Sequence, residues 1–246
     1  MKNKTFDFRA GELLLVDKPL EWTSFDVVNK IKYALNHGLA KGERIKVGHA
    51  GTLDPLATGL LIVATGKSTK KLGELQGLNK CYEGTIRLGG TTPSYDLETE
   101  VDEEFDIEHI TAEDLEKAKA SLTGSITQIP PIFSAVRIDG ERAYKKARRN
   151  DIKKLPDARN ITIKSFEFLK TNLPDVDFRV ECSKGTYIRS LAFDFGRALN
   201  NGAYLTRLVR TSVEEFELKD AYSLEEIVGI IQKAKDEDPF LPRKDQ

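Results

Sequence analysis

One glycine-rich stretch of the sequence, KVGHAGTLDPLATGLL, carries a single acid, Asp54, between apolar segments. Glycine lets the backbone approach a ligand closely, because it has no side chain in the way. Pro55 follows the acid and biases it toward an extended conformation, which would aim the carboxylate from a stiff turn. The pattern fits a catalytic carboxylate, but an Asp-Pro pair in a loop is usually an ordinary turn. The stretch alone leaves both interpretations open.

Two other stretches hold side chains that could assist a carboxylate. VECSKGTYIRSLAFDFG has the pattern of a strand followed by a helix that carries Arg189, and KCYEGTIRLGG places Tyr82 at the start of a strand. An arginine beside a buried aspartate would hold the carboxylate ionised and oriented through a bidentate pair. The alternatives are a surface salt bridge for Arg189 and a core position for Tyr82. Spacing in the sequence does not decide between them.

Several classes of protein are excluded or disfavoured. The stretch ATGKST resembles the end of a phosphate-binding loop, but that motif needs a glycine where Leu61 stands, so an NTPase is excluded. Cys81 and Cys182 form no metal-ligand spacing, so reduced thiols are expected. No apolar run approaches the ~20 residues that span a bilayer, and the first residues resemble no signal or transit peptide. We expect a cytoplasmic protein with no metal and no cofactor.

Charge is distributed unevenly, although the net charge is only −1. Residues 96–116 hold eleven Asp or Glu and no Lys or Arg. Residues 137–154 hold eight Lys or Arg against three acids, a local balance of +5. Such asymmetry can give a nearly neutral protein one positive face that attracts nucleic acid. A solvated surface segment is the alternative interpretation.

Hydrophobic periodicity predicts the elements that must position these side chains. We expect strands at 11–17, 60–65, 81–88, 161–169, 176–182 and 205–216, and helices at 67–75, 111–122 and 188–199. A further helix should begin at Thr23 or Ser24 and run to Leu35, with Phe25 on its apolar face. A turn at 139–140 should lead into a basic helix, and the polar tail beyond Leu241 should be frayed. Because strands and helices do not alternate regularly, a mixed or antiparallel sheet with helices against it is favoured, the α+β (mixed α/β) class.

Six stretches together resemble the TruB family of pseudouridine synthases, in the family's order: LLLVDKPLEWTS, VGHAGTLDPLATG, KCYEGTIRLGGTTPSYD, QIPPIFSAVRIDGERAYKKAR, CSKGTYIRSLAFDFG and GAYLTRLVRT. The resemblance runs from about Gly11 to Phe216, and the GTLDPLATG block is highly specific to the family. It implies a pseudouridine synthase fold, with a mixed, mostly antiparallel sheet flanked by helices and loops and an active-site cleft across the sheet. It also implies an enzyme that converts the T-loop uridine of tRNA, position 55, to pseudouridine.

The resemblance assigns a role to each matching residue. Asp54 matches the essential catalytic aspartate, Tyr82 the aromatic that stacks on the target base, and Arg189 the arginine that pairs with the aspartate. Leu208 matches a leucine of the uracil pocket, and His49 a histidine that contacts the T-loop. The mechanism would need neither metal nor cofactor.

Two further regions are carried over in the same way. Lys18 and Pro19 match a block that packs beside the site. The basic insertion 131–155 resembles the family's RNA-gripping thumb loop. Six of its residues are expected to bind the RNA backbone: Arg137, Arg142, Lys145, Lys146, Arg148 and Arg149.

The resemblance also bears on domains and partners. We expect one pseudouridine synthase domain over residues 1–246, with a core at about 11–216 and a short C-terminal extension, 217–246. Many family members carry a further C-terminal RNA-binding domain of the PUA type, for which this extension is too short. The expected partner is the T-arm stem-loop of tRNA, with no membrane, no obligate protein partner and a monomeric state. The alternatives are an RNA-binding or tRNA-folding module and a guided synthase that acts on other RNAs.

Overall fold

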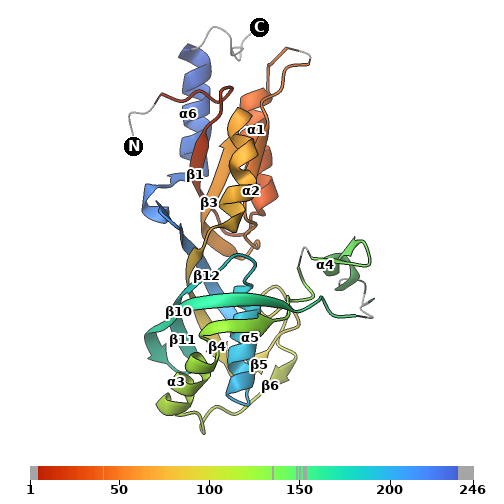
Figure 1. Ribbon diagram of the computed structural model, residues 1–246, viewed down its shortest axis with the longest axis vertical. Coiled ribbons are helices and arrows are strands. Elements are labelled where there is room, and N and C mark those ends of the chain that lie inside the picture. Colours follow the sequence, from red (N-terminus) through yellow and green to blue (C-terminus); the bar gives the residue numbers. More distant parts are fainter. Residues whose placement is uncertain are drawn as a thin grey trace. The chain divides into compact units, whose positions relative to one another are not determined.

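The computed structural model describes residues 5–40, 42–134, 136–147, 149, 151 and 154–237. The chain divides into two compact units (Figure 1). The terminal unit comprises Met1–Leu78 and Val209–Gln246, and the middle unit comprises Asn79–Leu208. Each unit therefore has its own core. The expectation that residues 1–246 form one catalytic domain concerns how the two units function together, and it stays a prediction.

The terminal unit is built on a mixed sheet. Strand β1 (Leu13–Lys18) pairs antiparallel with β3 (Ala57–Thr65), and β3 pairs antiparallel with β2 (Val47–Ala50). On its other edge β1 pairs in parallel with the short β14 (Tyr222–Ser223). The continuous apolar runs of β1 and β3 are explained by burial on both faces of this sheet.

Helices cover both faces of that sheet. One core cluster joins Leu14 and Leu61 to α1 (Ser24–Asn36) and α6 (Leu224–Glu237). A second cluster joins Leu15 and Leu60 to α2 (Leu72–Gly77), which follows the 3₁₀ helix η1 (Gly66–Lys71). Neighbouring residues of each strand thus enter opposite cores, as the period of two in a strand requires.

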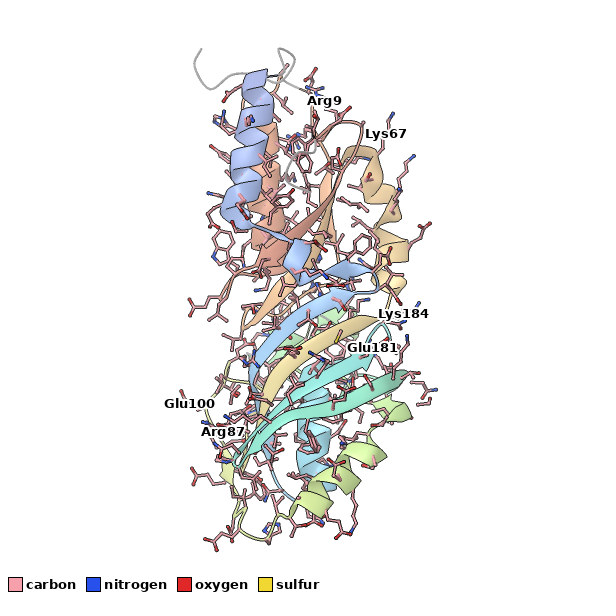
Figure 2. The ribbon with its side chains drawn as sticks, turned by 90° about the vertical axis from the view of Figure 1, so that its left-hand side faces the viewer. Arg9, Lys67, Arg87, Glu100, Glu181 and Lys184 are labelled. Atoms are coloured by element: carbon pink, nitrogen blue, oxygen red, sulfur yellow. The ribbon has the colours of Figure 1, made fainter. Side chains whose placement is uncertain are left out.

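The middle unit is an antiparallel sheet with helices against it. The order is β4 (Lys80–Leu88), β11 (Asp175–Cys182), β10 (Arg159–Asn172) and β7 (Gly124–Gln128). Helices α3 (Ala112–Ser121) and α5 (Ile188–Ala198) lie together beneath it (Figures 1 and 2). Phe195 of α5 packs edge-on against Phe166 and Phe168 of β10. The opposite face is charged and carries cross-strand ion pairs, such as Arg87 with Asp175 at 2.8 Å.

Shorter elements complete the two units. In the middle unit, β5 (Gly90–Thr91) pairs with β6 (Glu103–Glu104), and β8 (Arg137–Ile138) with β9 (Glu141–Arg142) before α4 (Ala143–Ala147). Strand β12 (Ala203–Val213) begins in the middle unit and ends in the terminal unit. There it turns back into β13 (Phe216–Glu217), which precedes the 3₁₀ helix η2 (Leu218–Asp220).

The predicted mixed sheet with helices against it is confirmed. Four local predictions were wrong. Phe25 is 66% exposed, and Val27 takes its place on the buried face of α1. The helix expected at 67–75 is split into η1 and α2, and the strand expected at 205–216 is broken at Glu214, where φ is +46°. The glycine-rich stretch, expected as a loop, starts in a strand, because Val47–Ala50 form β2.

Further outcomes concern helix α6, the C-terminal tail, the expected cleft and membrane-spanning helices. Helix α6 was not anticipated at all. The tail beyond Leu241 lies outside the described residues, and the cleft across the sheet stays a prediction. Among the described residues, no helix is both long and apolar enough to cross a membrane.

Candidate active site

Asp54 lies in the connection between β2 and β3 of the terminal unit. The two strands form an antiparallel pair, so residues 51–56 close a hairpin. Gly51 has φ +87°, a conformation that favours glycine, and the Ala57 N–H donates to the Asp54 carbonyl at 3.1 Å. The Asp54 side chain is half-buried. A carboxylate thus stands on a tight, hydrogen-bonded turn, as the Asp-Pro pair predicts.

Lys18 is fully buried at the end of β1, next to this turn. Its ammonium donates to the carbonyls of Pro19 at 2.8 Å, Trp22 at 2.6 Å and Pro55 at 3.3 Å. Burial lowers the pKa of Lys18 to about 8, against the opposing pull of the Asp54 charge. Three carbonyls take up the three donors of the ammonium, so Lys18 ties β1 to the residue after Asp54.

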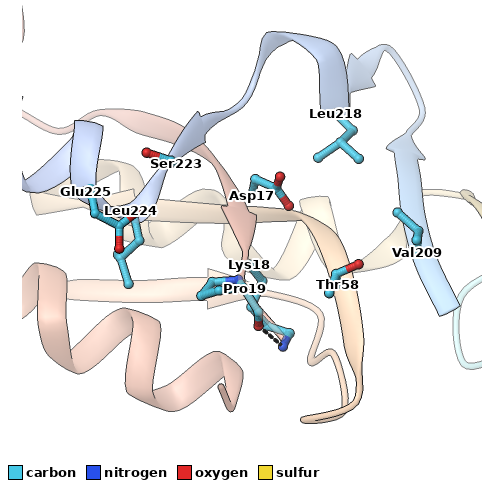
Figure 3. A pocket seen from close by; sticks show the side chains of 9 residues that line it. All are labelled: Asp17, Lys18, Pro19, Thr58, Val209, Leu218, Ser223, Leu224 and Glu225. Atoms are coloured by element: carbon cyan, nitrogen blue, oxygen red, sulfur yellow. Dashed lines mark hydrogen bonds between the residues drawn. The ribbon is translucent and has the colours of Figure 1, made fainter. Parts of the chain in front are cut away.

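A cavity of about 350 Å³ lies against the same strand (Figure 3). Figure 3 shows the Lys18 amine turned to the Pro19 carbonyl. Two of the lining residues, Asp17 and Glu225, are acids, and burial raises the pKa of the Asp17 carboxyl. The lysine of the lining, Lys18, already gives its donors to backbone carbonyls, so it does not offer them to a phosphate group in this cavity. Its lining consists of Asp17, Lys18, Pro19, Thr58, Val209, Leu218, Ser223, Leu224 and Glu225.

His49 lies in β2, half-buried and paired with Val63 of β3. Burial lowers the pKa of His49, and the nearby Arg210 charge lowers it further, so the neutral imidazole is favoured at neutral pH. Its Nδ1 atom is buried and has no hydrogen-bond partner within the described part of the chain. The predicted contact of His49 with the T-loop stays a prediction.

Arg189 lies in the first turn of α5 in the middle unit and is only 3% exposed. Its guanidinium donates to the Ser94 carbonyl at 3.0 Å and to the Phe133 carbonyl at 2.8 Å. Its Nε lies 3.6 Å from a carboxylate oxygen of Asp96. Arg189 is therefore a buried, multiply bonded cation, and the surface salt bridge considered for it is excluded. Its predicted pairing with Asp54 would join the two units and stays a prediction.

Asp96 is a buried neighbour of Arg189 that the sequence interpretation missed. It was counted only within the acidic stretch 96–116, yet it is the only buried acid of that stretch. The preceding Tyr95 has φ +63°, unusual for a bulky residue, and stacks on Phe193 with ring centroids 4.1 Å apart. This turn aims the Asp96 carboxylate at Arg189. The available signal was the TTPSYD block, which Asp96 ends.

Tyr82 and Leu208 both belong to the middle unit. Tyr82 is 8% exposed on the buried face of β4, opposite Val180 of β11. Leu208 is half-buried on β12, at the last position of the unit. Burial suits a core residue as well as one that stacks on a base, so the roles of both residues stay predictions.

The basic insertion forms a small hairpin and helix in the middle unit. Asp139 and Gly140 both have positive φ, at +51° and +82°, which confirms the predicted turn. Arg149 donates to both carboxylate oxygens of Glu141 at 2.9 and 2.8 Å, and Lys146 lies 3.3 Å from Asp139.

Four predicted RNA-binding cations of the insertion remain, and three of them lie among the described residues. Arg137, Arg142 and Lys145 are exposed and form no ion pair with any described residue. Arg148 lies outside the described residues.

Comparison with known proteins identifies relatives of this chain. Residues 39–188 match the family model described as "TruB family pseudouridylate synthase (N terminal domain)". Proteins named "tRNA pseudouridine synthase B" are 51% identical over 218 residues in Flavobacterium johnsoniae and 53% identical over 219 residues in Phocaeicola vulgatus. Both matches cover 89% of this chain, and they cover 95% and 92% of those proteins.

Solved structures agree with the sequence relatives. A chain of "Crystal Structure of a Cbf5-Nop10-Gar1 Complex" matches with a TM-score of 0.67 and 30% identity, over 90% of this chain and 54% of that one. A chain of "Structure of H/ACA RNP bound to a substrate RNA containing 2'-deoxyuridine" matches with a TM-score of 0.66 and 26% identity, over 95% and 58%. This chain thus spans little more than half of those chains.

The relatives and the mixed sheet define a pseudouridine synthase. The anchored aspartate of the β2–β3 hairpin lies inside the matched region. More narrowly, the chain belongs to the TruB family.

Proposed function

We propose that this chain converts the T-loop uridine of tRNA, position 55, to pseudouridine. The observation that carries the proposal is the identity of about half of all residues to proteins named tRNA pseudouridine synthase B, along almost the full length of both chains. The Asp54 turn and the buried Arg189 cluster supply a carboxylate and an oriented cation for such chemistry.

The reaction is an isomerisation, and its atoms balance without a co-reactant. The target base is first turned out of the folded loop, which costs a few kcal/mol. Stacking on Tyr82 would return about 1–3 kcal/mol. With the help of Asp54, the bond from the ribose to the uracil nitrogen breaks and a bond to uracil carbon 5 forms. Carbon 5 loses a proton and the freed nitrogen gains one, so no electron donor or acceptor is needed.

We further propose that the basic insertion grips the RNA backbone and that the chain acts as a monomer without an obligate protein partner. The exposed Arg137, Arg142 and Lys145 are the cations best placed to contact phosphates, because they are not engaged by described acids. The titles of the structural relatives name further proteins, Nop10 and Gar1. The higher identity to the synthase B proteins favours action without such partners over a guided synthase.

The test is the release of tritium from a T-arm stem-loop RNA labelled at carbon 5 of its uridines. Wild type should release label from one loop uridine, and Asp54→Asn should release none while still binding the RNA. Asp220→Asn, a change of the same kind at an exposed acid of the same unit, should behave as wild type. Binding without release by every variant would overturn the proposal in favour of an RNA-binding module.

A further inference from the structure

The turn that carries Asp54 is held by buried side chains at alternate backbone positions. At one end, Arg210 is 1% exposed and donates to the Gly51 carbonyl at 3.1 Å and to the Leu60 carbonyl at 2.7 Å. At the other end, the Pro55 carbonyl accepts from Lys18 at 3.3 Å and from the Glu21 N–H at 2.9 Å. Both ends of the turn are therefore fixed to neighbouring strands and loops.

Ser24 holds the position between these ends. Its side chain accepts from the Leu53 N–H at 2.8 Å and lies 3.2 Å from the Leu53 carbonyl, to which its hydroxyl donates. Ser24 is 1% exposed and Leu53 is 3% exposed, so water cannot replace either bond. One hydroxyl thus satisfies both backbone groups of the residue directly before Asp54.

Ser24 is itself rigidly placed. It is the first residue of α1. The next turns of α1 bury Val27 and Ile31 in the core of the terminal unit. The packing of α1 in the core therefore fixes Ser24, and Ser24 in turn fixes the backbone of Leu53, the residue before Asp54.

From this geometry we propose that Ser24 is a positioning residue for Asp54, an inference that rests on the proposed function. The hydroxyl touches no reacting atom. It sets the backbone from which the Asp54 carboxylate projects toward the ribose. A misplacement of about 1 Å can lower a catalysed rate roughly 100-fold. Loss of the hydrogen bonds between Ser24 and Leu53 should therefore slow the chemical step and leave RNA binding unchanged.

Thr23 provides a matched control, because it is the neighbouring hydroxyl residue at the same helix start. Its side chain accepts from the Asp26 N–H at 3.0 Å and donates to the Asp26 carboxylate at 2.5 Å, and among the described residues it makes no bond to the turn. Ser24→Ala and Thr23→Ala each remove one hydroxyl and its local hydrogen bonds, and both should lower the melting temperature. Only Ser24→Ala removes the hydrogen bonds to the Leu53 backbone.

The experiment measures single-turnover tritium release, RNA dissociation constant and melting temperature for wild type and the variants. Ser24→Ala should lower the rate constant about 10- to 100-fold and leave the dissociation constant within about twofold. Thr23→Ala should keep the wild-type rate constant. Ser24→Cys keeps most of the volume with a weaker donor and acceptor, so its rate constant should fall between those of wild type and Ser24→Ala.

The outcomes separate the two proposals. If wild type is active and Ser24→Ala is no slower than Thr23→Ala, the positioning role is wrong and the proposed function stands. If Ser24→Ala weakens RNA binding as much as turnover, the hydroxyl supports the RNA-binding surface instead, and the positioning role is again wrong. If wild type itself releases no label, the proposed function fails, and the positioning role fails with it.

Discussion

Arg189→Lys tests whether a buried guanidinium holds the middle unit's part of the site together. The arginine reaches three separate groups, the carbonyls of Ser94 and Phe133 and the carboxylate of Asp96. Lysine keeps the charge but presents it as a single point on a flexible stem. The three groups are reached by three different nitrogens of the spread guanidinium, so a single ammonium at this position should keep one of them and leave the other two without their donor.

The size of the effect follows from this count. A hydrogen bond to a charged group contributes about 1.5–3 kcal/mol, so two lost bonds cost about 3–6 kcal/mol. That is a large part of the about 5–15 kcal/mol by which native proteins are stable. At about 2–4 °C per kcal/mol for a chain of this size, the melting temperature should fall by about 6–24 °C. Turnover should fall further than RNA affinity, because the proposed partner of Arg189 is Asp54, the proposed catalytic residue.

The assay combines thermal unfolding with tritium release below the melting temperature of the variant. Arg179→Lys is the matched control, since Arg179 bonds to Glu83 on the exposed face of the same unit, and this substitution should cost under about 1 kcal/mol. A melting temperature for Arg189→Lys as high as that of Arg179→Lys would refute the account of Arg189 as a multiply bonded buried cation. Equal losses of turnover and RNA affinity would point to a phosphate contact.

Two further predictions concern pH and salt. Burial raises the pKa of Asp194 to about 6 in the folded protein, so unfolding free energy should fall as pH rises from about 4 through 6, where the folded state binds more protons. Asp194→Asn should remove that slope and raise the free energy of unfolding by about 1–2 kcal/mol at pH 7.5. Denaturant unfolding across pH measures both effects. A slope that is unchanged in the variant would exclude Asp194 as its source. Arg142→Ala and Lys145→Ala should each lower the slope of log affinity against log salt by about 0.7–0.9, measured by RNA binding between 50 and 200 mM salt. Arg149→Ala should change it less, because that cation is already paired, and equal changes for all three would show that the pairing does not matter.

Strong periodicity made most of the fold predictable from the sequence. Strand β4 alternates between a buried face with Tyr82 and Ile86 and a polar face, and this period of two is visible in the residue types alone. Strands β2 and β14 are too short to show any period. They exist because β3 and β1 offer them partners, which is tertiary information.

Helix α6 differs, because its signals were in the sequence. Leu224, Ile227 and Ile231 recur at helical spacing and are buried against α1. Ser223 and Glu226 exchange hydrogen bonds at 2.8 and 3.1 Å in the manner of a capping box. The family resemblance ends near Phe216, so it predicts no element in the segment beyond that residue.

The candidate site was predictable only where a residue type itself carries the chemistry. Asp54 and Arg189 stand out as an acid in a glycine-rich turn and an arginine in a specific block. Asp96 does not, because ten other acids follow it within residues 96–116 and its contact with Arg189 spans ninety-three positions. Only the fold shows which of eleven similar acids is buried beside a cation.

The backbone contacts that hold Asp54 in place were beyond prediction for a different reason, although Lys18 itself was expected beside the site. Lys18, Ser24 and Arg210 act on backbone carbonyls and one N–H, and every residue of the chain offers a carbonyl. No pairing of side-chain types marks such contacts in a sequence, whereas an acid and a base can at least be suspected of meeting. A polar side chain that is fully buried and bonded only to backbone therefore becomes informative once the fold is known. In this chain three such side chains bond to the backbone of the turn that carries Asp54. The sequence already predicts Asp54 itself, and the structure adds the residues that hold it in position.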